Sequence, residues 1–437
     1  MYTSASLGFS AIAIAAGLAG ASFAANLVEP GGTAAATHQA TFAQDEFGWQ
    51  LFFYVNQQAR LDKAGVPDDS KTSFAQYDPD KPVVWETWAL ATGGELVFAG
   101  VGDASEVFKS PATKPVAWDE LMRPEQQKVL APSLKSSPLI TLQPGALRNL
   151  PAGTLQAELT PDPGIAGMDE TRMNRVTYET IRDKGLYSLE GLDRAYAAAE
   201  ATGDPMVVDF EQAAKEVKAR WVRIDQPNEC NPDGADLNAA KRRYHWRTLT
   251  STDAAGQPEV QTWGLVSLHI ITKDLPNWFW VDFGHIDCVD VPPGKGEPVA
   301  PVDTTTRGPN AASGENGVRN ETRGTKWENY VMHGTQVAFT DALGKETILS
   351  NPVIEQQNQN SSCITCHARA AIAPQSSNLQ PGPSIPGLVG KTSSISPGVS
   401  FADVGVPDPV FEAGDQRYRQ IDFLWSIPFR AYSETEN

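Results

Sequence analysis

Cys363, Cys366 and His367 have the residue types and the spacing that covalent attachment of a haem requires. In a Cys-x-x-Cys-His segment each thiol adds to one haem vinyl group, and the adjacent imidazole becomes the proximal ligand of the iron. The chain has 437 residues but only 4 cysteines and 6 histidines, so chance would rarely place two cysteines and a histidine at this spacing. The motif predicts one covalently bound haem c.

Two other interpretations of the motif fit the sequence less well. A zinc site would need a second Cys or His pair at close spacing, whereas Cys230 and Cys288 lie far from the motif and from each other. A thioredoxin-like redox pair would follow a strand of a βαβ unit. Here the motif follows a polar Gln/Asn/Ser run at 356–362. Haem attachment therefore remains the favoured chemistry.

The N-terminus predicts export. An apolar stretch from about Leu7 to Gly20 is too short to span a bilayer permanently, and Ser22-Phe23-Ala24 offers small residues at the usual cleavage positions. We therefore expect a signal peptide at 1–24, cleaved near Ala24, and a periplasmic or otherwise exported protein. No Lys or Arg precedes the apolar stretch, which departs from the usual pattern. Export agrees with the motif, because haem c is attached after translocation.

Composition limits the partners. The formal net charge is -18, so nucleic acids and anionic membranes would repel the chain. No later segment has the length and apolarity of a membrane span, so we expect no integral membrane span. An acidic surface would suit docking to a basic redox partner protein, although it is also an ordinary means of keeping a protein soluble.

The two remaining cysteines form a candidate disulfide. Cys230 and Cys288 each lie in a turn-rich segment, and an oxidising compartment would allow them to pair. The alternative is two buried thiols. A bridge would join the two ends of the central β-rich segment.

The elements that must position these residues predict an α+β fold. We expect an antiparallel β-rich main body at 25–325 with helical insertions, and a loop-rich haem c region at 326–437 in which a short helix begins near Cys363. Residues 171–202 have helical composition. Residues 210–221 show apolar spacing of three and four, which indicates a helix or a helix that runs into a strand. The Ala/Thr/Gly-rich segment 25–45 is expected to be loose.

The sixth coordination position of the iron is the open question. No Met or His follows His367, and the last methionine is Met332. The position must therefore be filled by an upstream residue, by an unusual ligand such as Lys391 or a tyrosine, or by water. The upstream candidates are His245, His269, His285, Met332 and His333, with His38 of the N-terminal segment less suited.

A predicted hairpin contains two of these candidates. Two apolar strands at 263–272 and 278–285 flank a turn. A turn centred on Leu275 would place His269 and His285 on one face, roughly 13 Å apart at ~3.3 Å per residue, so only one could reach an iron. A register shifted by one residue would place them on opposite faces. We take His285 or His269 as the possible distal ligand, although a histidine in an apolar strand often hydrogen-bonds a neighbour in the core.

An ordered set of motifs carries a resemblance to a known family. The motifs are Trp49-Gln50-x-Phe52, Val84-Trp85-Glu86-Thr87-Trp88, Glu216-Val217-Lys218-Ala219-x-Trp221, Leu268-His269-Ile270-x-x-Lys273, Pro276-x-Trp278-x-Trp280-x-x-Phe283-x-His285, the Cys-x-x-Cys-His segment and Asp422-Phe423-x-Trp425-x-Ile427-Pro428-Phe429. Together they resemble large exported bacterial proteins called cytochrome c family proteins, with a single late haem motif. The resemblance covers most of the mature chain. It implies one covalent haem, an export signal and a redox role, and it supplies no substrate.

Three functions remain open. The first is electron transfer by a haem whose two axial positions are filled by side chains. The second is a haem enzyme, or a protein that binds a gas or peroxide, with an open distal site. Its polar distal group would be Arg369, His333 or His285, although Arg369 would also suit a contact with a haem propionate. A variant of this function would have Lys326 crosslinked to the haem. The third is a ligand-binding module coupled to a haem, which the 11 tryptophans would suit. The first is favoured, and whether the chain is an oxidoreductase enzyme is left undecided.

Overall fold

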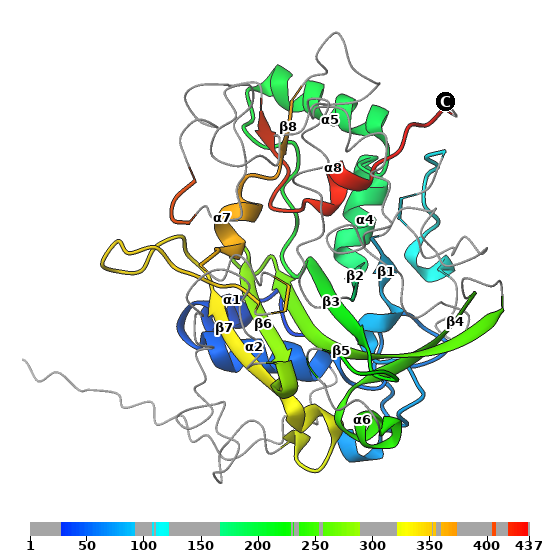
Figure 1. Cartoon of the computed structure of the whole chain (residues 1–437). Helices are drawn as coiled ribbons and strands as arrows, with labels where there is room; N and C mark the ends of the chain where they lie inside the picture. The colour runs from blue at the N-terminus through cyan, green and yellow to red at the C-terminus, as the bar shows by residue number, and fades with distance from the viewer. Residues whose placement is uncertain are drawn as a thin grey trace, which may run out of the picture.

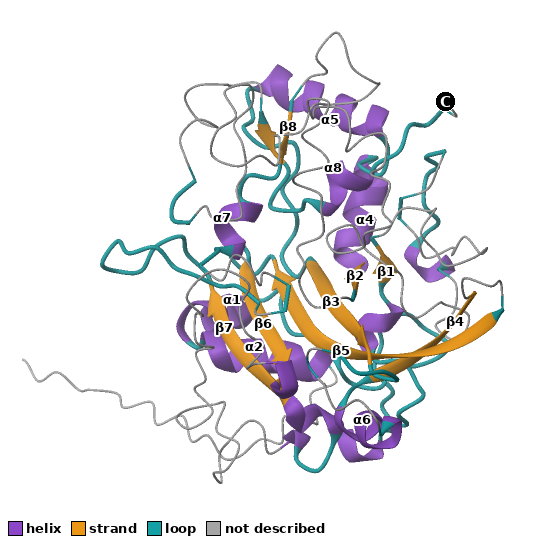
Figure 2. Cartoon of the chain, viewed as in Figure 1, coloured by secondary structure: helices purple, strands orange, loops and turns teal. Residues whose placement is uncertain are grey.

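One antiparallel sheet organises the chain, and helices cover it from several sides (Figures 1 and 2). This computed structural model describes residues 28–91, 107–108, 111–121, 167–228, 230, 236–252, 257–288, 321–351, 353–354, 360–373, 404–407 and 418–435. The expected signal peptide at 1–24 and Lys391 lie outside these residues. The α+β class with an antiparallel sheet is confirmed.

The sheet has seven strands in the order β1-β2-β3-β5-β6-β7, and β4 pairs with β5 beside this path. Its strands are β1 (Ala89–Leu90), β2 (Met168–Met173), β3 (Lys215–Arg223), β4 (Trp246–Thr252), β5 (Pro258–Thr272), β6 (Phe279–His285) and β7 (Tyr330–Gln336). A two-stranded sheet pairs β8 (Ala371–Ile372) with β9 (Arg419–Gln420). The strand β7 belongs to the region 326–437 and completes the sheet of the main body.

The described α-helices surround this sheet (Figure 2). They are α1 (Ala34–Phe42), α2 (Gln44–Val55), α4 (Arg175–Lys184), α5 (Leu189–Thr202), α6 (Leu237–Arg243), α7 (Cys363–His367) and α8 (Ser426–Arg430). The helical composition of 171–202 is confirmed by α4 and α5. Asn174 and Ser188 cap their N-termini through side-chain oxygens, and Gly185 and Gly203 end them with left-handed φ values of 74° and 73°.

Two local predictions were wrong in part: the helix expected within 210–221 is absent, although the strand of the second alternative is present, and the N-terminal segment contains a helix. Lys215–Trp221 is a strand, because charged and apolar residues alternate with period two from Glu216 to Trp221 and thereby suit a sheet with two different faces. The apolar residues at 210–214, which suggested a helix, only precede this strand. The segment 25–45 is not loose throughout: Thr33 accepts a hydrogen bond from the Ala36 amide and starts α1.

Helix α2 covers one face of the sheet with aromatic side chains. Phe47 lies edge-on to Phe279 of β6 with ring centroids 4.9 Å apart, and Phe52 lies 4.4 Å from Phe283. Gly48 allows this close approach, because a Cβ there would lie 2.8 Å from Met332 Cε. All these aromatic rings are nearly or fully buried. We call this side of the sheet the α2 face.

The predicted disulfide is present. Cys230 and Cys288 are bonded, with Cα atoms 4.5 Å apart, and both side chains are buried. The bridge joins the segment after β3 to the end of β6, as expected from the turn-rich surroundings of both cysteines.

Candidate functional site

The haem motif forms a helix of its own. Ser362 caps α7 by accepting a hydrogen bond from Thr365 N, and the helix then contains all five motif residues. Cys363 and Cys366 are three positions apart and therefore lie on one side of the helix. Both are half-buried and neither belongs to the disulfide. The predicted short helix beginning near Cys363 is confirmed.

The sheet holds this helix through one glutamine. Gln336, the last residue of β7, donates from Nε2 to Ser362 Oγ at 2.9 Å and accepts at Oε1 from Ile364 N at 3.0 Å. Cys363 adds a thiol hydrogen bond to the Leu349 carbonyl at 3.0 Å. Both sides of the Gln336 amide are thus used to fix the start of α7 against the end of β7.

His367 is held in one tautomer. Its Nδ1 lies 2.8 Å from the carbonyl oxygen of Phe423. Because a carbonyl oxygen can only accept, Nδ1 must donate, and the lone pair of the neutral ring is then on Nε2. Metal-binding histidines are commonly oriented by such a bond from the other ring nitrogen. The imidazole also packs on Trp280 of β6, with ring centroids 4.7 Å apart.

Trp280 and Gln336 define the sheet face that α7 contacts. Trp280 is separated by one residue from Asp282, so both project to this side, whereas Phe279, Val281 and Phe283 project to the α2 face. We call the side of Trp280 the α7 face. The two faces sort the candidate distal ligands.

His285 lies on the α2 face and is fully engaged. The strand register pairs His269 with Asp282, so these two side chains share a face. His285 is three residues after Asp282 in the same strand, and because side chains alternate it points to the opposite face. The expectation that both histidines share one face is therefore wrong, and the shifted register is the one observed. His285 Nε2 donates to the Arg243 carbonyl, Nδ1 accepts from Asp287 N, and the ring stacks on Tyr244 at 3.8 Å. Burial lowers its pKa to about 4. With both ring nitrogens used, His285 is not suited to bind iron at α7.

Met332 and His245 lie on the α2 side as well. Met332 packs against Gly48 of α2. His245 stacks on Trp327, which itself contacts Phe52, and its Nε2 lies 3.0 Å from Glu86 Oε1. Burial lowers the pKa of His245 to about 3, so this is a hydrogen bond of a neutral ring rather than an ion pair.

His269 and His333 lie on the α7 face and share one carboxylate. His333 Nδ1 donates to Asp282 Oδ2 at 2.7 Å, and His269 Nδ1 lies 3.3 Å from Asp282 Oδ1. Asn351 Nδ2 donates to both oxygens, at 3.0 and 2.8 Å. Asp282 is completely buried. Within the described part of the chain, Nε2 of His269 and Nε2 of His333 are buried without a hydrogen-bond partner.

A β-bulge sets the direction of His333. Asp282 pairs with Gly334 but Phe283 pairs with Met332, so His333 is the extra residue between them. The bulge changes the phase of β7, and His333 and Gln336 therefore face α7 together although they are three residues apart. Gly284 leaves room for the imidazole, because a Cβ at Gly284 would lie only 2.3 Å from His333 Cε1.

Buried charges continue along the α7 face beyond these histidines. Asp169 of β2 pairs with Lys218 Nζ at 3.0 Å and Arg220 Nη1 at 3.2 Å, both from β3. Lys218 is directly opposite His269 in the register. Glu216, at the other end of β3, accepts a hydrogen bond from Ser426 Oγ, and burial raises its pKa to about 7.

The other residues that could act in haem chemistry lie elsewhere. Lys326 lies in the 3₁₀ turn Lys326–Asn329 that precedes β7, at the end of this strand away from α7. The strand has seven residues, which span about 20 Å. Burial lowers the pKa of Lys326 to about 7. Arg369 is buried two residues after His367, and His38 lies in α1, where it contacts Phe42.

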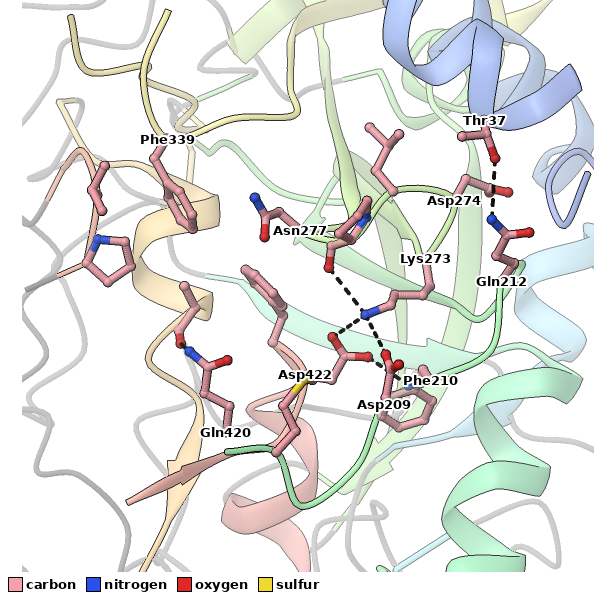
Figure 3. A pocket seen from close by; sticks show the side chains of 17 residues that line it. Thr37, Asp209, Phe210, Gln212, Lys273, Asp274, Asn277, Phe339, Gln420 and Asp422 are labelled. Atoms are coloured by element: carbon pink, nitrogen blue, oxygen red, sulfur yellow. Dashed lines mark hydrogen bonds and ion pairs between the residues drawn. The ribbon is translucent and has the colours of Figure 1, made fainter. Parts of the chain in front are cut away.

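A cavity of about 750 Å³ adjoins the C-terminal end of α7 (Figure 3). Lys273 lies in its wall and donates to Asp422 Oδ1 at 2.6 Å, to Asp209 Oδ1 at 3.0 Å and to the Pro276 carbonyl at 3.2 Å. Phe423, whose carbonyl accepts from His367, also lines the cavity. The residue whose carbonyl orients His367 is thus part of the cavity wall.

Sequence reasoning missed the residues that orient the histidines. Asp282 was not singled out, although a carboxylate within an apolar strand is a signal that it has buried partners. The roles of Gln336, Asn351 and the Phe423 carbonyl depend on contacts between distant segments and leave no local pattern. They could not be read from the motif.

Comparisons with protein-family models, with curated proteins and with solved structures gave no match for this chain. Among the residues that the structure describes, no helix is long and apolar enough to cross a membrane. Over the same residues, no group of three or more His, Cys, Asp or Glu side chains is arranged around a common metal position.

Proposed function

We propose that this chain is an exported c-type cytochrome that carries one covalent haem and transfers single electrons. Cys363 and Cys366 would hold the haem through thioether bonds, and His367 would bind the iron from the proximal side. When bound, the haem supplies reversible one-electron chemistry, whose potential depends on the axial ligands and on burial. The acidic surface suits a basic redox partner protein.

The hydrogen bond from His367 Nδ1 to Phe423 carries this proposal. It fixes the tautomer that an iron ligand needs, next to two half-buried cysteines on one side of the same short helix. A thiol pair used only for redox exchange would not require an oriented imidazole. The donor set of α7 therefore fits a covalently attached haem.

Asp282 supports a sixth ligand from the α7 face. The carboxylate accepts a hydrogen bond from His333 Nδ1, which leaves the lone pair of that ring on Nε2, and it lies 3.3 Å from His269 Nδ1. These two residues are therefore our distal candidates, and His285 is withdrawn from this role. A filled distal position favours electron transfer over binding of small gas molecules.

Haem attachment is tested by producing the full chain, with its N-terminal segment, in bacteria that have a haem c maturation system. We expect one haem that remains bound after denaturation, and none in the Cys363→Ala/Cys366→Ala variant. The matched control is Cys230→Ala/Cys288→Ala, which removes the other cysteine pair and should retain the haem. Denaturation that releases all haem from the wild-type protein would refute covalent attachment.

The distal ligand is tested by optical spectroscopy of the reduced protein with and without carbon monoxide. For the wild-type protein we expect a low-spin spectrum that carbon monoxide does not change. One of the two variants, His269→Ala or His333→Ala, should lose the distal ligand and form a carbon monoxide complex. His285→Phe is the control, because it keeps a ring against Tyr244 on the other side of the sheet. Carbon monoxide binding by the wild-type protein would instead favour an open-site haem enzyme or gas-binding protein.

A further inference from the structure

The carbonyl that orients His367 belongs to a strained turn. Asp422 and Phe423 have φ values of 49° and 70°, although neither is glycine. Such left-handed conformations are unfavourable for residues other than glycine and persist only where surrounding contacts enforce them. The turn places the Phe423 carbonyl 2.8 Å from His367 Nδ1. Contacts that hold this turn therefore also hold the imidazole.

The Asp422 carboxylate makes those contacts. Its Oδ1 accepts from Lys273 Nζ at 2.6 Å and from Trp278 Nε1 at 3.0 Å, and its Oδ2 accepts from Phe210 N at 2.8 Å. The side chain of Asp422 is fully buried and that of Lys273 is only 10% exposed. A buried pair of opposite charges with these hydrogen bonds is a strong constraint on geometry.

Lys273 connects this turn to the sheet. It follows β5 directly, and its backbone amide donates to the Ala214 carbonyl at 2.9 Å. Its ammonium also reaches Asp209, whose side chain is 73% exposed at the cavity wall. Figure 3 shows Lys273 between the two carboxylates, at the side of the cavity. The turn of β5–β6 is thus tied to the segment that contacts His367.

We infer that Lys273 and Asp422 are positioning residues for the proximal imidazole, and that their ion pair sets the reduction potential of the haem by fixing the Phe423–His367 hydrogen bond. This inference rests on the proposed haem attachment. A firm hydrogen bond at Nδ1 makes the imidazole a more basic ligand, which stabilises ferric over ferrous iron. Loosening the turn would weaken that bond and favour the ferrous state.

The direction of the potential shift distinguishes positioning from simple charge effects. Removing the negative charge of Asp422 would favour ferrous haem through space, and removing the positive charge of Lys273 would favour ferric haem. Positioning predicts the same direction for both changes, because both break the same ion pair. Lys273→Met is therefore the decisive variant, because positioning and charge predict opposite shifts for it, and Asp422→Asn tests whether both changes move the potential in the same direction.

The experiment is a redox titration of the haem-loaded full chain. We expect Asp422→Asn and Lys273→Met each to shift the equilibrium toward ferrous haem by about threefold or more, which is about 30 mV at 59 mV per tenfold for one electron. Lys273→Arg keeps the positive charge and should therefore keep the wild-type reduction potential. Asp209→Asn is the matched control: it removes the exposed partner of the same lysine, does not touch the turn, and should leave the potential unchanged.

The failures are distinguishable. Wild-type protein without covalent haem refutes the proposed function, and the inference with it. Haem-loaded variants whose potentials stay at the wild-type value, or move in opposite directions, refute the positioning role alone. A loss of thermal stability without a potential shift has the same meaning, because it assigns the ion pair to folding only.

Discussion

Replacement of Gly284 by alanine tests the geometry of the α7 face with one methyl group. A Cβ at this position would lie 2.3 Å from Cε1 and 2.6 Å from Nε2 of His333, which is closer than real Cβ contacts come. The His333 ring must therefore rotate away. Rotation breaks the 2.7 Å hydrogen bond from Nδ1 to Asp282, while Asn351 and His269 remain beside the carboxylate.

The expected cost follows from these contacts. Losing a buried hydrogen bond to a charged acceptor costs about 1.5–3 kcal/mol, and holding a ring away from its preferred rotamer costs about 0.5–1.5 kcal/mol. Gly284→Ala should therefore lower the free energy of unfolding by about 2–4 kcal/mol. Denaturant unfolding followed by circular dichroism measures this difference. The covalent haem content should not change, because α7 is held by Gln336 and not by His333.

A double-mutant cycle with His333→Ala supplies the refutation. If the clash with the ring is the cause, Gly284→Ala should be nearly neutral in the His333→Ala background, within about 0.5 kcal/mol, and the coupling energy should equal most of the original loss. An equal cost in both backgrounds would assign the effect to the backbone of β6. An unchanged stability in the single variant would mean that His333 does not lie over Gly284.

Two further predictions concern stability. Replacing both Cys230 and Cys288 by serine should lower the free energy of unfolding by about 4 kcal/mol, which is the chain-entropy value for a loop of 58 residues. Denaturant unfolding of the oxidised protein measures this loss, and a loss below about 1 kcal/mol would contradict the prediction. Burial raises the pKa of Glu216 to about 7, so between pH 4.5 and 7 the folded state keeps a proton that the unfolded state has released. The free energy of unfolding therefore falls as pH rises through this window, and the contribution of this group is lost above about pH 7. Glu216→Gln should therefore gain stability relative to wild type as pH rises from 4.5 to above 7, by up to about 3 kcal/mol, and a pH-independent difference between the two proteins would refute this.

The sequence predicted those features that depend on residues close together in the chain. The Cys363–His367 motif predicted its own short helix, the apolar runs predicted the β5–β6 hairpin, and the turn-rich cysteines predicted their disulfide. The register of the hairpin was not readable, because the turn at 273–278 includes Trp278 with a φ of 61°, which no residue preference announces. That register reversed the expected side of His285. The bulge at His333 was not predicted either, although the adjacent Gly334 within the strand is a signal for one.

Both sheet faces bury charged and polar side chains. The α2 face carries the aromatic packing of α2, which stabilises the fold by the hydrophobic effect, but it also buries the Glu170–Arg172 ion pair and His285. The α7 face buries Asp169, Asp282 and His333, and buried charges and polar rings stabilise a fold less than apolar side chains of the same size would.

The buried polar groups of the α7 face differ from those of the α2 face in lying beside the haem motif. Asp282 contacts the Nδ1 atoms of His333 and His269 on the side of the sheet on which Trp280 packs against His367. Both rings have an Nε2 atom that is buried and without a hydrogen-bond partner among the described residues, as a ligand atom in the proposed function would need. Replacing Asp282 by asparagine would put an amide nitrogen, which cannot accept, in place of one carboxylate oxygen, so the hydrogen bonds from His333 Nδ1 and Asn351 Nδ2 could no longer all form. We expect a lower free energy of unfolding in denaturant and, in the haem-loaded chain, a carbon monoxide complex. An unchanged stability would show that the carboxylate does not hold these donors.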